Sequence, residues 1–198
     1  MPDEVVIPPL PPTIELGTVR LRGLRPDDAA ALLACLGNPI VIEHTSYPVQ
    51  DAASVAGFID IFRRGYARGS SCRWALARAS DDVLIGTCGF NSWAPEYAST
   101  ELAYDLAPEY WGHGLMRQAV GAALAWAFGT AGFNRVQAIV MVSNARSAGL
   151  LTRLGFHQEG TLRSYRIARG VPRDFWIYSL LKGEWAGAPS VTAPPRTA

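Results

Sequence analysis

The chain has 198 residues, of which 49% are hydrophobic, and its formal net charge is +1 at pH 7. This length and composition predict one soluble globular domain with a sizeable core. The near-neutral charge gives no electrostatic reason to expect nucleic acid or an anionic membrane as a partner. Three cysteines without a C-x-x-C pair favour neither a disulfide framework nor a zinc site. We therefore expect reduced thiols, no metal and a cytoplasmic protein.

Both ends of the chain are rich in proline, which predicts loosely ordered segments at residues 1–13 and 187–198 around one domain at 14–186. The N-terminal residues lack the charged start and apolar run of a secretion signal. The uncharged run at 118–134 contains three glycines and is too short to span a membrane comfortably. It predicts a buried helix instead.

The first elements alternate between strand and helix patterns. Residues 18–24 alternate apolar and basic side chains, which predicts a half-buried strand. Pro26, followed by two aspartates, indicates the start of a helix. Asp51 is a suitable N-cap for a second helix. Its apolar residues recur at helical spacing: Val55, Phe58, Ile59, Phe62 and Tyr66.

The rest of the chain alternates short strands with helices. Strands are expected at 72–79, 83–90 and 99–106, then a helix after the glycines of 112–114. A strand at 135–142, a short helix at 145–154 and two long strands near 156–168 and 173–182 complete the pattern. The order βααβββαβαββ predicts a mixed α/β sheet.

The stretch "EYWGHGLMRQAVGAALAWAF" at 109–128 places two glycines directly before a helix. Glycine admits close approach, and the first N–H groups of a helix lack intrahelical partners, so the pattern suits a phosphate site. A P-loop is excluded because no Lys-Ser/Thr pair follows the glycines, and the dinucleotide fingerprint lacks its third glycine. Taken alone, the pattern fits equally a turn that lets a strand and a helix lie close together.

Three separated segments give the pattern a more specific meaning. "LAPEYWGHGLMRQA", "NARSAGLLTRLGFHQEGTLR" and "GVPRDFWIYSLLKGEW" occur in that order. They resemble the GNAT superfamily of acetyl-CoA-dependent N-acetyltransferases, in particular the branch that contains the ribosomal-protein N-terminal acetyltransferases. The resemblance covers about residues 13–186. Glu109 departs from the superfamily pattern [QR]-x-x-G-x-[GA], which prefers glutamine or arginine at its first position.

The resemblance implies a GNAT fold and a site for acetyl-CoA. The backbone around the glycines would bind the pyrophosphate, and the pantetheine arm would lie between the fourth and fifth strands, near Leu106. Asn144 would bond to pantetheine, although asparagine is also a favoured helix N-cap. The residues expected at the pyrophosphate are Gly112, His113, Gly114, Leu115, Met116 and Arg117.

Acyl transfer to an amine needs a base for the amine and a donor for the leaving thiolate. The resemblance places Glu101 as the base and Ser147 near the sulfur. Many superfamily members carry a tyrosine acid where this chain has Leu151, so Ser147 or water must act instead. Tyr104 is a secondary candidate on the opposite face of the strand from Glu101. A solvated, non-catalytic Glu101 is the alternative.

The acceptor cleft is expected between the loop joining the first two helices and the turn joining the last two strands. Glu43, His44 and Tyr47 belong to the loop, whereas Arg163 belongs to a basic cluster at the turn. That cluster suits an acidic acceptor or is simply solvated, and its other members are Tyr165, Arg166, Arg169 and Arg173. The expected acceptor is the α-amine of a protein or peptide.

Three functions fit the sequence: an acetyl-CoA-dependent N-acetyltransferase, a nicotinamide-dependent oxidoreductase, and a CoA-binding regulator without turnover. The first agrees best with the order of the motifs. A small-molecule amine such as a polyamine or an antibiotic is the alternative acceptor. The acyl chain and the choice between monomer and homodimer stay open.

Overall fold

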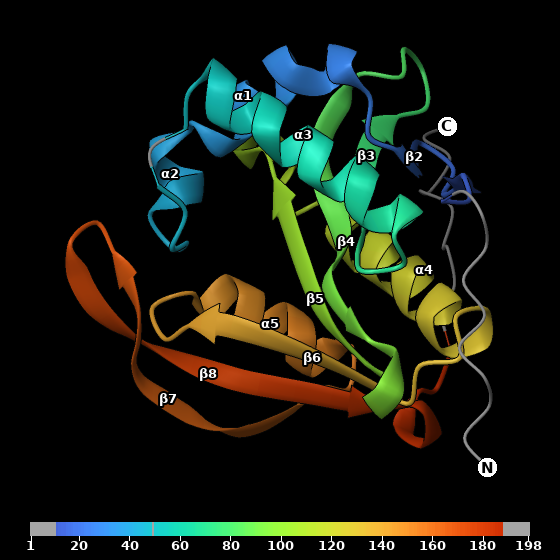
Figure 1. Cartoon of the computed structure of the whole chain (residues 1–198), viewed down its shortest axis with the longest axis vertical. Helices are drawn as coiled ribbons and strands as arrows, with labels where there is room; N and C mark the ends of the chain where they lie inside the picture. Colours follow the sequence, from blue (N-terminus) through green and yellow to red (C-terminus); the bar gives the residue numbers. More distant parts are fainter. Residues whose placement is uncertain (1–10, 49, 188–198) are drawn as a thin grey trace, which may run out of the picture.

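The computed structural model describes residues 11–48 and 50–187, which form one eight-stranded sheet with helices on both faces (Figure 1). The strand order across the sheet is β1-β2-β3-β4-β5-β6-β8-β7. The strands are β1 (Ile14–Glu15), β2 (Val19–Gly23), β3 (Cys72–Arg78), β4 (Leu84–Ala94), β5 (Ser99–Leu106), β6 (Arg135–Met141), β7 (His157–Ala168) and β8 (Val171–Leu181). The helices are α1 (Ala29–Leu36), α2 (Pro39–Ile42), α3 (Ala52–Ala67), α4 (Leu115–Gly129) and α5 (Ala145–Arg153).

The mixed α/β sheet predicted from the sequence is confirmed, with three local differences. A two-residue strand, β1, precedes β2, and the short helix α2 lies between the two expected N-terminal helices. Strand β4 continues to Ala94, beyond the expected end at residue 90. The extension follows a bulge at Asn91, which has no partner on β5, and it carries the buried side chain of Trp93.

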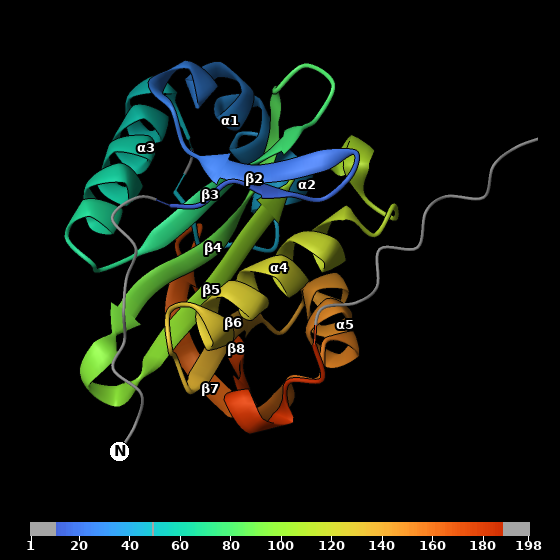
Figure 2. The same cartoon turned by 90° about the vertical axis from the view of Figure 1, so that its right-hand side faces the viewer.

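Helices α1 and α3 cover one face of the sheet, and α4 and α5 cover the other (Figure 2). On the first face, Leu32 of α1 and Ile59 of α3 pack with Ala75 of β3. On the second face, α4 is buried along most of its length, as expected for the run at 118–134. No helix in the described ranges is long and apolar enough to cross a membrane.

The sheet is nearly split between β5 and β6, the one parallel pair of neighbouring strands in the described part of the chain. These strands pair only where Ser99, Thr100 and Glu101 meet Arg135, Val136 and Gln137. Beyond Glu101, β5 keeps its pairing with β4, and β6 keeps its pairing with β8. The two strands therefore diverge toward the N-terminal end of α4, and the predicted gap is present.

Candidate active site

Two cavities meet at the gap between β5 and β6. A groove of about 910 Å³ runs along the end of β5, the two glycines Gly112 and Gly114, residues 115–117 and the first turns of α5. A smaller cavity of about 100 Å³ lies between β5, β6, the loop after α2 and strand β7. Both are lined by His44, Thr45, Tyr104, Asn144 and Ser147. A molecule lying in the groove therefore reaches the small cavity at these side chains.

The glycines at the start of α4 form one end of the groove. Gly112 and Gly114 have φ angles of +83° and +74°, and Gly114 is the N-cap of α4. The positive φ angles favour glycine for the backbone, and a Cβ atom at either position would meet no protein atom within 4 Å, so the space beside both glycines is open. The first N–H groups of α4 lack intrahelical acceptors and carry partial positive charge. This geometry suits a pyrophosphate.

Three arginines add positive charge along the same groove, namely Arg117, Arg146 and Arg153. The Arg146 guanidinium lies 4.2 Å from the centre of the Trp111 ring, and the Trp111 indole donates to the carbonyl of Leu106 over 2.8 Å. These contacts fix one wall of the groove. Of the residues predicted to bind CoA, all but His113 line this groove, and the exposed His113 does not.

At the junction of the two cavities, Asn144 and Ser147 hold the start of α5. The Asn144 Oδ1 atom accepts a hydrogen bond from the Ser147 N–H at 3.0 Å, so the N-cap interpretation of Asn144 is confirmed. The Ser147 Oγ atom lies 2.7 Å from the phenol oxygen of Tyr104. Desolvation raises the Tyr104 pKa above its ordinary value, which keeps this phenol protonated.

Strand β5 thus places a phenol beside Ser147, whereas residue 151 carries none. Leu151 itself is fully buried in the main core. Tyr104 and Glu101 leave β5 on opposite faces, as expected from strand alternation. Both still line the small cavity, because the gap between β5 and β6 opens it to both faces of the sheet.

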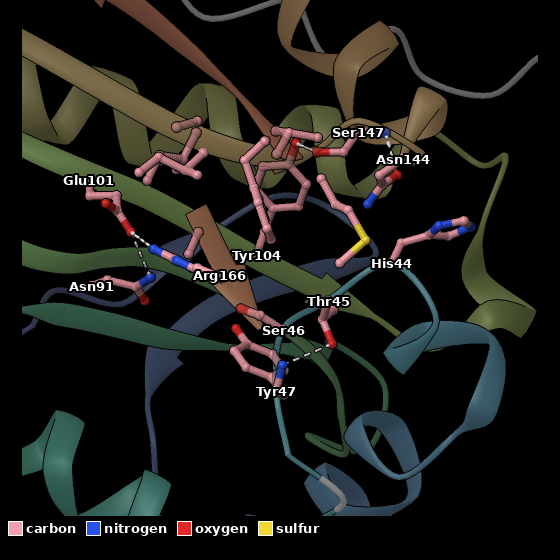
Figure 3. Close-up of a pocket in the computed structure, with 17 residues that line it drawn as sticks. His44, Thr45, Ser46, Tyr47, Asn91, Glu101, Tyr104, Asn144, Ser147 and Arg166 are labelled. Atoms are coloured by element: carbon pink, nitrogen blue, oxygen red, sulfur yellow. Dashed lines mark hydrogen bonds and ion pairs between the residues drawn. The ribbon is translucent and has the colours of Figure 1, made fainter. Parts of the chain in front are cut away.

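Glu101 lies at the other side of the small cavity from Ser147 (Figure 3). Its Oε1 atom accepts a hydrogen bond from the Asn91 amide at 3.3 Å. The Asn91 carbonyl in turn accepts from Arg73 at 2.8 Å. Since arginine can only donate, this contact orients the Asn91 amide so that its NH₂ group faces Glu101. The bulge in β4 aims Asn91 at Glu101, a contact that the sequence pattern did not predict.

Arg73 belongs to a buried ionic cluster beneath the cavity. Its side chain is 0% exposed, and it forms an ion pair with Asp105. Arg73 also donates to Thr87 at 3.0 Å, and Thr87 donates to Asp105 at 3.2 Å. The Tyr47 hydroxyl lies 3.5 Å from Asp105, and burial raises the Tyr47 pKa to about 12. The charges of Arg73 and Asp105 are therefore satisfied within the protein.

The predicted basic cluster separates into residues with different surroundings. Arg166 lines the small cavity, with a guanidinium nitrogen 3.8 Å from Glu101 Oε1. Arg163 does not reach that cavity, and lies instead with Tyr165 and Asp174 around a separate, shallow hollow. The reason is a bulge in β7, where only Asp174 stands opposite residues 163–165.

The loop after α2 forms one wall of the small cavity. His44 Nδ1 lies 3.3 Å from Ser143 Oγ, and Tyr47 joins the lining as expected. Glu43 is exposed and lines neither cavity. Its carbonyl accepts a hydrogen bond from Arg169 at 2.7 Å, and Arg169 also donates to the carbonyls of Ile42 and Thr45. Arg169 thus ties the loop to the β7–β8 turn.

A split mixed sheet, a glycine-rich helix start beside the split and a groove reaching a second cavity define an acyltransferase of the CoA-dependent class. Residues 18–157 match the model of the acetyltransferase (GNAT) domain. The chain belongs to the GNAT family and is an N-acetyltransferase. Members of this family use acetyl-CoA.

Several named proteins are similar to the chain. It is 31% identical to the uncharacterized N-acetyltransferase YoaA of Bacillus subtilis, over 86% of this chain and 97% of that protein. It is 30% identical to the ribosomal protein uS5-alanine N-acetyltransferase of Escherichia coli, over 74% of each. A structure of RimL, a ribosomal L7/L12 α-N-protein acetyltransferase in complex with coenzyme A, superposes with a TM-score of 0.78 at 19% identity, covering 86% of this chain and 98% of that one.

Proposed function

We propose that this N-acetyltransferase transfers an acetyl group from acetyl-CoA to the α-amine of a protein or peptide. The observation that carries the proposal is the junction of the two cavities at Tyr104 and Ser147. The groove leads a long, anionic molecule to that junction, and the small cavity leads an acceptor to it from the other side. The name of the relative that modifies an alanine of protein uS5 supports the same class of acceptor.

The residues around the junction suit the steps of acyl transfer. Acetyl-CoA supplies an activated thioester. Glu101, at 16% side-chain exposure, takes the proton of the attacking amine, directly or through water. Tyr104 and Ser147 share one hydrogen bond and keep a further O–H available, which stabilises the negative charge that develops on oxygen or sulfur. These side chains favour turnover over binding alone.

The pKa values of the two kinds of amine favour an α-amine over a lysine side chain as the acceptor. An α-amine has a pKa of about 7.7 to 8.0 and is partly neutral near pH 7.4, whereas a lysine amine, at about 10.4, is neutral roughly once in a thousand molecules. Arg166 places a positive charge beside the cavity, which further disfavours a protonated amine. A single carboxylate base is better matched to the less basic acceptor.

The test is a competition between two peptides that differ in which amine is free. One has a free N-terminus and no lysine, and its twin has a blocked N-terminus and one lysine. We expect preferential acetylation of the first, by mass spectrometry, with release of one thiol for each acetyl group. Glu101→Gln should lower the rate most at low pH, where most of the amine is protonated, and should leave acetyl-CoA binding unchanged.

Other outcomes point to other functions. Preference for the blocked lysine peptide would overturn the α-amine assignment. Acetylation of polyamines or antibiotics alone would make the chain a small-molecule acetyltransferase. Acetyl-CoA binding with no thiol release from any amine in the panel would favour a CoA-binding regulator.

A further inference from the structure

Arg166 places in the small cavity a guanidinium group to which the proposed chemistry assigns no binding partner. The side chain is 35% exposed and comes from β7, on the opposite side of the cavity from α5 (Figure 3). Arg173, which stands opposite Arg166 in the strand register, is exposed and adds a second positive charge, whereas two further charged groups nearby have partners within the protein. Asp105 pairs with buried Arg73, and Arg169 donates to backbone carbonyls.

A bulge in β7 determines the position of Arg166 beside the cavity. Leu162 pairs with Phe175 and Arg166 with Arg173, so three β7 residues stand opposite the single residue Asp174. Ser164 in this bulge has a φ of +49°, and its N–H donates to the Asp174 carboxylate at 2.7 Å. In a regular ladder Ser164 would stand opposite Arg173, and the two extra residues of the bulge bring Arg166 to that position instead.

Aromatic rings hold the guanidinium once it is there. The Arg166 Cζ atom lies 5.1 Å from the centre of the Tyr165 ring and 5.6 Å from that of the Phe175 ring. Both distances fall within the range of cation–π attraction. The rings restrict the long side chain without using its N–H donors, so less conformational freedom is lost when an anion binds.

The ion pair of Arg166 with Glu101 is loose. The closest N···O distance is 3.8 Å, whereas a charge-assisted hydrogen bond is about 2.7 to 2.9 Å. Glu101 receives its hydrogen bond from Asn91 instead. Arg166 therefore keeps its donors for a planar anion, while Glu101 keeps an oxygen for the amine. The cavity offers an anion and a cation side by side.

We propose that Arg166 binds a carboxylate of the acceptor, and that the preferred acceptor is a peptide with aspartate or glutamate among its first two residues. The inference rests on the proposed α-amine function and names the substrate class for the same site. The amine meets Glu101, the acidic side chain meets Arg166, and the loose internal pair is exchanged for two intermolecular contacts. A bidentate guanidinium–carboxylate contact also fixes the orientation of the acceptor.

The test uses two pairs of peptides, one with aspartate or asparagine first and one with aspartate or asparagine second. The wild-type protein should show at least about a tenfold higher kcat/KM for the acidic member of one pair, since hydrogen bonds to charged groups reach that strength. Arg166→Gln should reduce the preference to less than twofold, and Arg166→Lys should restore only part of it. Arg163→Gln, which removes the same charge from the same bulge outside the cavity, should keep it.

Equal rates for both members of each pair, or a preference that survives in Arg166→Gln, would overturn the inference and leave the α-amine function standing. Loss of the preference in Arg163→Gln as well would show that the preference comes from the overall electrostatic field of the protein and not from binding at Arg166. That result would also overturn the inference. Free aspartate and asparagine complete the panel. If no peptide reacts, the α-amine peptide function falls. In that case, a preference for free aspartate over free asparagine that depends on Arg166 would support the carboxylate site. Absence of that preference would overturn the carboxylate site as well.

Discussion

The side chains of Tyr104 and Ser147 form a hydrogen bond at the junction of the groove and the small cavity. The raised pKa of Tyr104 has a direct consequence for the pH dependence of the reaction. A tyrosine ordinarily ionises near pH 10. A pKa raised by desolvation means that the phenol stays protonated, and able to donate, up to and beyond that pH. Loss of its proton therefore does not limit the rate in the neutral and mildly alkaline range.

We predict that Tyr104→Phe lowers kcat by roughly a hundredfold, the loss typical of one donor to a developing negative charge. The affinity for acetyl-CoA, measured by calorimetry, should change little. The wild-type kcat should show no fall from tyrosine ionisation below about pH 10. Tyr97→Phe, at a residue that is 77% exposed, is the control and should leave kcat unaltered. A fully active Tyr104→Phe protein would remove this residue from the proposed mechanism.

The site residues that the sequence predicts best are those in local patterns. Asn144 as an N-cap and the glycines at 112 and 114 follow from a few adjacent residues, and the structure places them as expected. Asn91 and Arg166 could not be predicted in this way. Each depends on a bulge: one extra residue in β4 changes the facing of the side chains after it, and two extra residues in β7 bring Arg166 to the position opposite Arg173. Arg73 could not be predicted either, because the sequence shows an arginine in a strand but does not show which residues it contacts.

At the scale of elements, the start of α4 combines two properties that a mutation can separate. The positive φ of Gly114 favours glycine for the backbone, and the open space around it leaves room for a ligand. A larger residue there would suffer backbone strain of about 1 to 2 kcal/mol, as for other residues in the left-handed region. It would also fill the space in which we place the phosphate oxygens.

We predict that Gly114→Val still folds, with a modest loss of stability, but no longer gains stability from acetyl-CoA. Gly17→Val is the matched control, since Gly17 has a φ of +78°, lies in the turn between β1 and β2, and also meets nothing within 4 Å. The control should lose similar stability and keep its response to acetyl-CoA. Normal acetyl-CoA binding by folded Gly114→Val would show that the pyrophosphate lies elsewhere. Thermal unfolding with and without acetyl-CoA measures both effects.

The elements themselves were predictable to different degrees. Long helices and strands with clear periodicity, such as α3 and β3, appear where the pattern puts them. The short elements β1 and α2 were missed, because two and four residues are too few to establish a period. The end of β4 was also missed, since the Asn91 bulge interrupts the alternation that marks a strand.

For the molecule as a whole, we predict that acetyl-CoA, and not NAD, raises the melting temperature. A ligand at about 100 times its dissociation constant adds roughly 2.7 kcal/mol of stability. For a chain of this size each kcal/mol corresponds to about 2 to 4 °C, so the shift should be several degrees. A shift with NAD and none with acetyl-CoA would contradict the proposed cosubstrate. A scanning fluorimetry titration with both molecules decides between them.

The contact between Arg169 and the loop after α2 changes the shape of the opening through which the proposed acceptor would arrive. Strands β5 and β6 alone would form a V, joined at residues 99–101 and 135–137 and open at the far end. Three hydrogen bonds from Arg169 join the β7–β8 turn to the loop after α2, which lies 124 to 127 residues away in the chain, across that open end. The gap between β5 and β6 is therefore bounded at both ends, by the strand pairing at one end and by the Arg169 contact at the other. A flexible chain end can pass through a narrow opening of this kind. An amine in the middle of a rigid surface could enter only if the hydrogen bonds of Arg169 broke first.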